Sequence, residues 1–177
     1  DEENKIVKSA TGEVEWDYGN GQIRVNTPKT KLVLGFLGSE NQFGSLKMRT
    51  TKGYGVVGMA SIDNLPLEES SKILLTVSGR DRNSGQALQY LQRNGKIVDS
   101  YESFCMKKVG GPPLIYEPVE VELNLKGAKN GEWKIIPLDL SGRPRQEKIK
   151  TLNATGGLLS AKISNKEYES LNFVLQK

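Results

Sequence analysis

Short stretches in which apolar and polar residues alternate, separated by glycine-rich turns, most constrain how this chain can fold. Val14 and Trp16 alternate with acidic residues, and Ile23 and Val25 alternate with polar ones. Between them, the segment Tyr18-Gly19-Asn20-Gly21 contains the Asn-Gly pair that is typical of a tight hairpin turn. A period of two places successive side chains on opposite faces of a strand. This segment therefore predicts a β-hairpin with one apolar face.

The same pattern recurs along the chain. We count about twelve short strands, spaced by roughly 8 to 12 residues with turn residues between most of them, and almost no helical periodicity. This predicts an all-β fold, an antiparallel β-sandwich or jelly roll. No internal repeat, low-complexity tract or linker interrupts the pattern, so residues 1–177 are predicted to form a single domain.

Several segments are candidates for the core. The run from Lys31 to Leu37 has little polarity, which is typical of a strand that is buried on both faces. Trp16 shares a strand face with Val14, and Phe36, Phe104 and Phe173 lie among apolar residues. We expect these four aromatic rings to pack in the core, because burying a large ring removes much apolar surface from water.

The stretch from Lys72 to Leu125 is the centre of the predicted fold. A strand ends at Gly79, a polar turn follows from Arg80 to Gly85, and after a long excursion the chain returns from Pro112 to Leu125. In the returning strand, one carboxylate, Glu117, falls on the otherwise apolar side, where it would be costly without a partner. Arg80 and Arg82 are the nearest candidate partners. The sequence therefore predicts a polar site at the end of two core strands.

Two kinds of chemistry suit this polar site. Arg80, Arg82, Asn83 and Glu117 present guanidinium, amide and carboxylate groups that make paired hydrogen bonds with neighbouring hydroxyls of a sugar. The alternative is an ion pair that holds a long loop. The oxygens of Asp81, Asn83 and nearby carbonyls would also suit a structural calcium ion, although the spacing of a complete calcium loop is missing. No other cofactor is indicated.

Aromatic residues outside the core are candidates for stacking on a sugar ring. The tyrosines on turns, loops or the polar side of strands are Tyr18, Tyr54, Tyr90, Tyr101 and Tyr116. Trp133 stands at the start of a strand, where stacking on a ligand and packing at the edge of the core are both compatible with the sequence. For each tyrosine, the alternative is a half-buried ring with its hydroxyl in water.

The composition excludes or disfavours several classes of function. The chain has no histidine and a single cysteine, Cys105, so the imidazole-dependent triads, an internal disulfide and a Cys/His zinc site are excluded. Catalysis by carboxylates stays open. The net charge is +4 and the basic residues are scattered, which disfavours nucleic-acid binding. No apolar run approaches the roughly 20 residues that span a membrane. Because no signal peptide is present at Asp1, a secreted origin implies that the signal has been removed.

Three stretches together resemble a known module. They are Thr11-Gly12-Glu13-Val14-Glu15-Trp16-Asp17 leading to Val25-Asn26-Thr27-Pro28-Lys29-Thr30, then Leu74-Leu75-Thr76-Val77-Ser78-Gly79-Arg80 with Asn83-Ser84-Gly85, and Pro113-Leu114-Ile115-Tyr116-Glu117-Pro118-Val119. The chain resembles, over residues 11–142, the β-sandwich module that follows the catalytic barrel in a group of large secreted bacterial glycoside hydrolases. The resemblance implies a non-catalytic module, carbohydrate-binding or barrel-supporting, that works outside the cell or in the periplasm. It carries over no ligand residues.

Three functional hypotheses follow. The first is a carbohydrate-binding module of a secreted polysaccharide-degrading enzyme, which binds a plant-type β-glycan such as β-glucan or xylan through aromatic stacking and polar loop contacts. Its partners would be the polysaccharide and a catalytic glycoside hydrolase domain in the same parent chain. The second is a structural module that docks on the catalytic barrel, which an exposed apolar patch would favour. The third is a small β-sandwich lyase or glycosidase, which requires a cleft with a perturbed acid, base or tyrosine.

Overall fold

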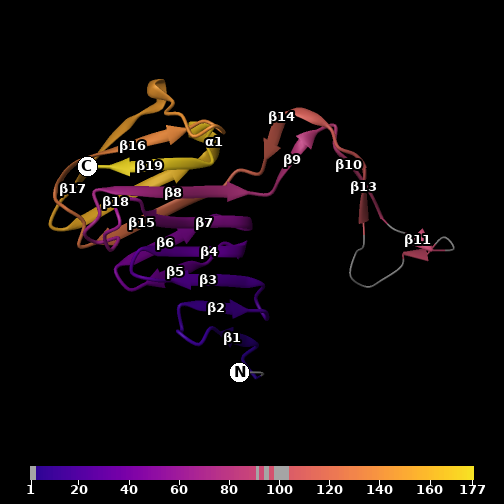
Figure 1. The fold of residues 1–177 in the computed structure, drawn as a ribbon, viewed down its shortest axis with the longest axis horizontal. Coiled ribbons are helices and arrows are strands. Elements are labelled where there is room, and N and C mark those ends of the chain that lie inside the picture. The colour runs from indigo at the N-terminus through magenta and orange to yellow at the C-terminus, as the bar shows by residue number, and fades with distance from the viewer. Residues whose placement is uncertain (1–2, 91, 94–95, 98–103) are drawn as a thin grey trace. The chain divides into compact units, whose positions relative to one another are not determined.

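The computed structural model describes residues 3–90, 92–93, 96–97 and 104–177, and its fold is all-β (Figure 1). The prediction of an antiparallel β-sandwich of short strands is confirmed. The described residues form nineteen strands rather than about twelve, because the chain between Gly79 and Pro118 adds several short ladders and because the predicted strand from Pro112 to Leu125 is interrupted. The helical elements are a single turn, α1 (Asn165–Tyr168), and a 3-10 turn, η1 (Gln146–Lys148).

The larger sheet has nine antiparallel strands. In spatial order they are β1 (Ile6–Lys8), β2 (Val14–Asp17), β3 (Gln22–Asn26), β4 (Thr30–Leu37), β7 (Gly53–Ser61), β8 (Lys72–Gly79), β19 (Asn172–Gln176), β16 (Gly131–Leu138) and β17 (Lys150–Ala154). The predicted hairpin is present as β2 and β3, with Trp16 opposite Ile23.

The smaller sheet has four strands and covers part of the larger one. In spatial order they are β18 (Leu158–Ser164), β15 (Glu120–Lys126), β6 (Leu46–Thr50) and β5 (Glu40–Phe43). Buried side chains of both sheets form one core cluster, which includes Val33, Val57, Val77, Leu75 and Phe173 from the larger sheet and Leu46, Met48, Val121, Leu123 and Leu125 from the smaller. The core position predicted for Phe173 is confirmed, whereas the side chain of Phe104 lies outside the described residues.

The prediction of one strand returning from Pro112 to Leu125 is correct only for its second half. In β15, Val121, Leu123 and Leu125 are fully buried, as their alternation predicts. The first half is a separate strand, β14 (Gly111–Tyr116), which pairs with β9 (Asp81–Ser84) instead of joining either large sheet. Ile115 is therefore 44% exposed and does not share the apolar side of β15.

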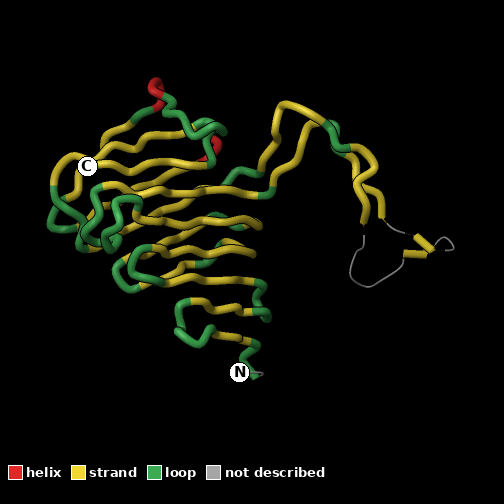
Figure 2. The backbone as a smooth tube through the Cα atoms, in the orientation of Figure 1, coloured by secondary structure: helices red, strands yellow, loops and turns green. Residues whose placement is uncertain are grey.

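The contacts divide the chain into two compact units, residues 1–79 with 118–177, and residues 80–117. The second unit is a series of two-stranded ribbons (Figure 2): β9 with β14, β10 (Ala87–Tyr90) with β13 (Phe104–Lys108), and β11 (Gln92–Arg93) with β12 (Lys96–Ile97). The single-domain prediction for residues 1–177 concerns cooperative folding and stays a prediction.

The core does not extend under the whole nine-stranded sheet. No residue of β1, β2 or β3 belongs to the core cluster. On the core side of these three strands, charged groups replace apolar ones: Glu15 contacts Lys8 at 3.1 Å and Arg24 at 3.7 Å, and the guanidinium of Arg24 lies 4.9 Å from the centre of the Phe43 ring. We call β1–β3 the wing of the sheet.

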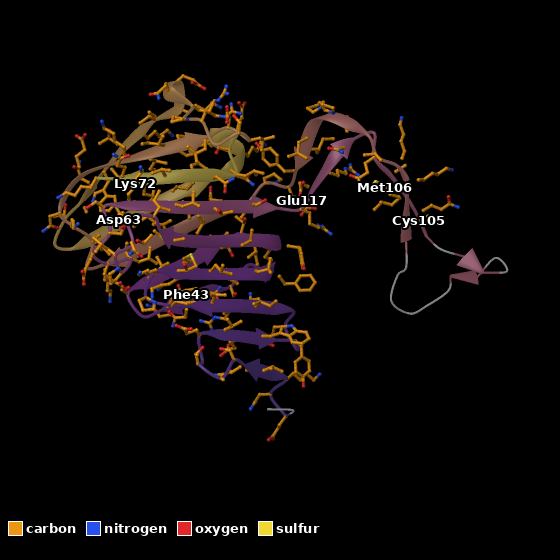
Figure 3. The ribbon with its side chains drawn as sticks, viewed as in Figure 1. Phe43, Asp63, Lys72, Cys105, Met106 and Glu117 are labelled. Carbon is orange, nitrogen blue, oxygen red and sulfur yellow. The ribbon has the colours of Figure 1, made fainter. Side chains whose placement is uncertain are left out.

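The loop between β7 and β8 is held by one carboxylate. Asp63 accepts hydrogen bonds from the backbone N–H of Ser71 at 2.7 Å, from the Ser70 hydroxyl at 2.7 Å and from the Ser61 hydroxyl at 2.9 Å. The N–H of Ser71, followed by the two hydroxyls, holds the pKa of Asp63 well below its usual range, because these bonds favour the ionised form. Asp63 and Lys72 lie near the same end of β8 (Figure 3).

We predict that Asp63→Ala lowers the free energy of unfolding at pH 7 by about 1–3 kcal/mol, because three donors lose a charged acceptor. Since the pKa is lowered in the folded protein, this stabilisation is present above the unfolded pKa of about 4 and is lost as the pH falls below it. Urea titrations of both proteins at pH 7 and pH 3 measure this, and the difference between them should shrink at pH 3. An equal difference at both pH values would contradict the assigned role of the ionised carboxylate.

Candidate functional site

Trp133 is not a surface platform. Its side chain is only 1% exposed, and its Nε1–H donates to the carbonyl oxygen of Lys129 at 2.8 Å. In β16, Trp133 alternates with exposed Lys134 and shares the inward side with Ile135, so the pleat directs the indole into the core. Of the two environments that the sequence left open, the structure therefore selects core packing.

The predicted tyrosines fall into three groups. Tyr18 and Tyr54 are each 42% exposed, as a stacking role requires. Tyr116 is half-buried at the end of β14. Tyr101 and the side chain of Tyr90 lie outside the described residues.

Trp16 and Phe36, which the sequence assigns to the core, are exposed instead. Trp16 is 50% exposed on β2, and Phe36 is 59% exposed on β4. Both belong to the face of the nine-stranded sheet that points away from the smaller sheet, because the residues that alternate with Phe36 in β4, such as Val33 and Leu37, fill the core. The core prediction for these two rings is wrong.

Together with Tyr18 and Tyr54, these two rings form a group that we call the aromatic cluster. The rings of Trp16 and Tyr18 are 5.7 Å apart and tilted by 59°, and those of Phe36 and Tyr54 are 5.3 Å apart and nearly perpendicular. Phe36 packs beside Gly21 in the hairpin turn, where a Cβ atom would lie 2.7 Å from a carbon of the Phe36 ring. The glycine that the turn requires also makes room for this ring.

The strand register extends the exposed surface beyond the aromatic cluster. Trp16 lies opposite Ile23, Ile23 opposite Leu34, and Leu34 opposite Val56. We call the resulting surface the outer face. Its apolar members are Val14, Trp16, Ile23, Val25, Leu32, Leu34, Phe36, Tyr54, Val56, Ala60 and Leu74, all of which are exposed or half-buried. An uncovered apolar surface of this kind marks a binding or docking site in soluble proteins.

The outer face carries few charged side chains, and on β16 an acidic one, Glu132, lies on the same side as Lys134. From β2 through β8 to β19, its positions carry no acidic side chain, and Lys72 is a cation on it. Gln176 lies between Lys72 and Lys134 in the strand register, so the two lysines are two strands apart, about 10 Å. Neither forms an ion pair with another of the described residues, whereas most lysines of the smaller sheet do.

The predicted polar site is a structural ion pair. Glu117 accepts from Arg80 through both Nε (3.0 Å) and Nη2 (2.7 Å), and the Glu117 backbone N–H donates to the Arg80 carbonyl at 2.8 Å. The hydrogen bond to Glu117, followed by its charge, raises the pKa of Arg80. The pairing of Glu117 with Arg80 is confirmed, and it joins the two chain ends of the 80–117 unit. Figure 3 labels Glu117 at one of these ends.

Arg82 and Asn83 do not join this pair. Arg82 lies on β9 opposite Ile115, and the amide of Asn83 donates to the Val109 carbonyl at 3.2 Å. Among the described residues, no three acidic, histidine or cysteine side chains gather where they would hold a metal ion, so calcium at Asp81 and Asn83 stays a prediction from the sequence alone.

Neighbouring groups lower the pKa values of three carboxyls outside the ion pair of Arg80 and Glu117. Asn20 lowers the pKa of Asp17 mainly through its side-chain amide, the Arg143 N–H lowers that of Asp139, and Lys148 lowers that of Glu169. These shifts stabilise the ionised form. A general acid requires the opposite shift, so these shifts disfavour the three carboxyls in that one role.

Sequence reasoning missed the outer face as a site. The signal was present in the run from Lys31 to Leu37, which is apolar at both alternate sets of positions. We interpreted this pattern as a strand buried on both faces, and the structure covers only one of them.

Comparison with protein-family models, with curated proteins and with solved structures finds no match to this chain. In the part of the chain that the structure describes, no helix has the length and apolarity needed to cross a membrane.

The two tryptophans should behave differently on truncation. We predict that Trp133→Ala lowers the free energy of unfolding by about 3–5 kcal/mol, as expected for a large buried ring, and that Trp16→Ala costs about 1 kcal/mol or less because half of its surface is already in water. Chemical denaturation followed by circular dichroism measures both. Equal losses would contradict the exposed position of Trp16.

Proposed function

We propose that this chain is a non-catalytic module of a secreted or periplasmic polysaccharide-degrading enzyme, and that it docks through the outer face on the catalytic glycoside hydrolase domain of its parent chain. The observation that carries this proposal is the apolar side of β4 that no other layer of its unit covers. Its inward residues fill the core, whereas Leu34 and Phe36 on the opposite side are 38% and 59% exposed. β4 has the composition of a strand that is buried on both faces, so we expect another protein surface to pack against its exposed side.

The wing supports the same conclusion. The smaller sheet buries no residue of β1–β3, so neither side of the wing contributes to the core. Charged side chains nevertheless occupy one side, with Glu15 and Arg24 in contact, and apolar side chains such as Val14, Trp16 and Ile23 occupy the other. The charged side of the wing meets the smaller sheet, where Arg24 lies over the Phe43 ring. The core of this unit does not require the apolar side, so a contact outside the unit would account for it.

The chemistry of the outer face favours a protein partner over a glycan. A sugar site needs placed donors and acceptors for the hydroxyls. On the outer face, the hydroxyl of Thr76 already donates to Asn172 at 2.8 Å and that of Ser78 to the Gly79 carbonyl at 3.1 Å. The exposed aliphatic groups of Val14 and Leu34 suit the apolar centre of a domain interface.

Glycan binding is the second candidate, and the aromatic cluster is the observation that favours it. The two rings of each pair lie within 6 Å of one another, Trp16 and Tyr18 along β2 and the turn after it, and Phe36 and Tyr54 across the neighbouring strands β4 and β7. A stacking platform for a β-glucan or xylan chain would require exposed rings of this kind. This candidate uses Tyr18 and Tyr54 as the sequence predicts, with Trp16 and Phe36 in place of Trp133.

Affinity electrophoresis separates the two candidates. The purified protein is run through gels that contain cellulose derivatives, mixed-linkage glucan, xylan, mannan, pectin or alginate, and the release of reducing sugar is assayed in parallel. We expect no retardation and no product. Retardation that is lost in Tyr54→Ala but kept in Val14→Thr would establish the glycan candidate, and product release would establish an enzyme.

Docking itself is tested by calorimetry against the catalytic domain of the parent chain, produced as a separate polypeptide. We predict that Leu34→Asp weakens this association at least about tenfold, because it places an unpaired carboxylate in an apolar contact. Its matched control is Ser160→Asp on the exposed side of β18, which should bind as the wild type does. Equal binding of both variants would contradict docking through the outer face.

A further inference from the structure

Some asparagines of this chain are followed directly by glycine. They form the pairs Asn20-Gly21, Asn94-Gly95 and Asn130-Gly131. In such a pair no side chain shields the following backbone nitrogen, because glycine has no Cβ atom. That nitrogen can therefore reach the side-chain carbonyl carbon of the asparagine. Asn94 and Gly95 lie outside the described residues, and the other two pairs have different surroundings.

The first pair lies in the turn between β2 and β3, where Asn20 is exposed. Gly21 has a φ of 64°, in the left-handed region. A side chain at this position would be strained, and its Cβ atom would lie 2.7 Å from the Phe36 ring. The fold therefore requires glycine after Asn20, and no larger residue can take its place to shield the reactive nitrogen.

The surroundings of the turn allow it to open locally. The turn belongs to the wing, which contributes no residue to the core cluster. By contrast, the side-chain oxygen of Asn130 accepts from the Gly157 N–H at 2.7 Å, and the carbonyl of the preceding residue, Lys129, accepts from the buried indole of Trp133. Segments with few buried contacts open at the lowest free-energy cost. We therefore expect Asn20 to react before Asn130.

Asp17 makes a change at Asn20 consequential. Its carboxylate accepts from Nδ2 of the Asn20 side chain at 2.7 Å and from the Asn20 backbone N–H at 2.8 Å. The Asn20 side chain is the main cause of the lowered pKa of Asp17, and Arg24 adds a weaker favourable charge. A carboxylate at position 20 would remove the side-chain donor and place two negative groups next to each other.

These observations together point to a chemical modification. We propose that Asn20 is a site of spontaneous deamidation, and that the reaction loosens the turn between β2 and β3. The Gly21 nitrogen attacks the side-chain carbonyl carbon of Asn20, so that a new carbon–nitrogen bond forms and the bond from that carbon to Nδ2 breaks. Ammonia leaves with the proton of the Gly21 nitrogen. Water then opens the cyclic imide at either carbonyl and yields aspartate or isoaspartate.

Both products affect the aromatic cluster. Each places a carboxylate near Asp17, and isoaspartate also lengthens the main chain at position 20 by one carbon. The same turn carries Tyr18, which contacts Trp16, and Gly21 packs against Phe36. The inference does not depend on what the outer face binds, because it concerns the stability of the turn itself.

The first test is to incubate the 177-residue protein in mildly alkaline buffer and to map the products by proteolysis and mass spectrometry, with isoaspartate-specific enzymatic methylation to separate the two. We expect conversion at Asn20 before Asn130, with a melting temperature that falls as Asn20 is lost. The matched control is Asn20→Gln, which keeps an amide donor but must close a larger ring. It should keep its melting temperature over the time in which wild type loses Asn20. Conversion of Asn130 first, or none of Asn20 in the folded protein, would overturn the proposal.

A charge swap tests the consequence of the reaction. Asn20→Asp should lower the melting temperature at neutral pH, and adding Asp17→Asn should restore most of it, because an amide and a carboxylate then face each other again. The wing lies outside the core cluster, so these variants are expected to fold. An Asn20→Asp variant as stable as wild type, or a double variant no more stable than Asn20→Asp, would contradict the assigned repulsion from Asp17.

Discussion

The structure depends on a mismatch between its two sheets. The larger sheet has nine strands and the smaller has four, so the apolar residues of the larger sheet find a cover on one side only, and only from β4 onward. Within the covered part, Val33, Val57, Val77 and Leu75 are fully buried and belong to the same core cluster as residues of β6 and β15. On the opposite side, the same strands carry an apolar surface that no part of their own unit covers.

This mismatch gives the two ends of the larger sheet different tasks. From β4 to β16, the inward side chains supply the hydrophobic stabilisation of the fold, with Trp133 as the largest contributor. The wing, β1–β3, supplies none of this core, yet it keeps one charged side and one apolar side. Under the proposed function, the outer face is one half of an interface, and the aromatic cluster lies toward one end of its strands.

The polar groups have structural tasks in this arrangement. Asp63 fixes the loop before β8, and the pair of Arg80 and Glu117 closes the base of the 80–117 ribbons. Their charges are satisfied by partners nearby.

The sequence by itself determined the fold class and the β2–β3 hairpin, because period-two alternation and Asn-Gly turns are local signals. It also offered Arg80 and Arg82 as partners of Glu117, but it did so from a continuous strand that the structure interrupts between β14 and β15. It also determined which residues share a side of each strand. Tertiary structure decided which side is covered. Trp16 and Trp133 both stand on strands with apolar neighbours, and Phe36 lies in the most apolar run of the chain, but only the placement of the four-stranded sheet buries Trp133 and leaves the other two exposed. Alternation defines a face, and burial depends on whether another layer packs against it.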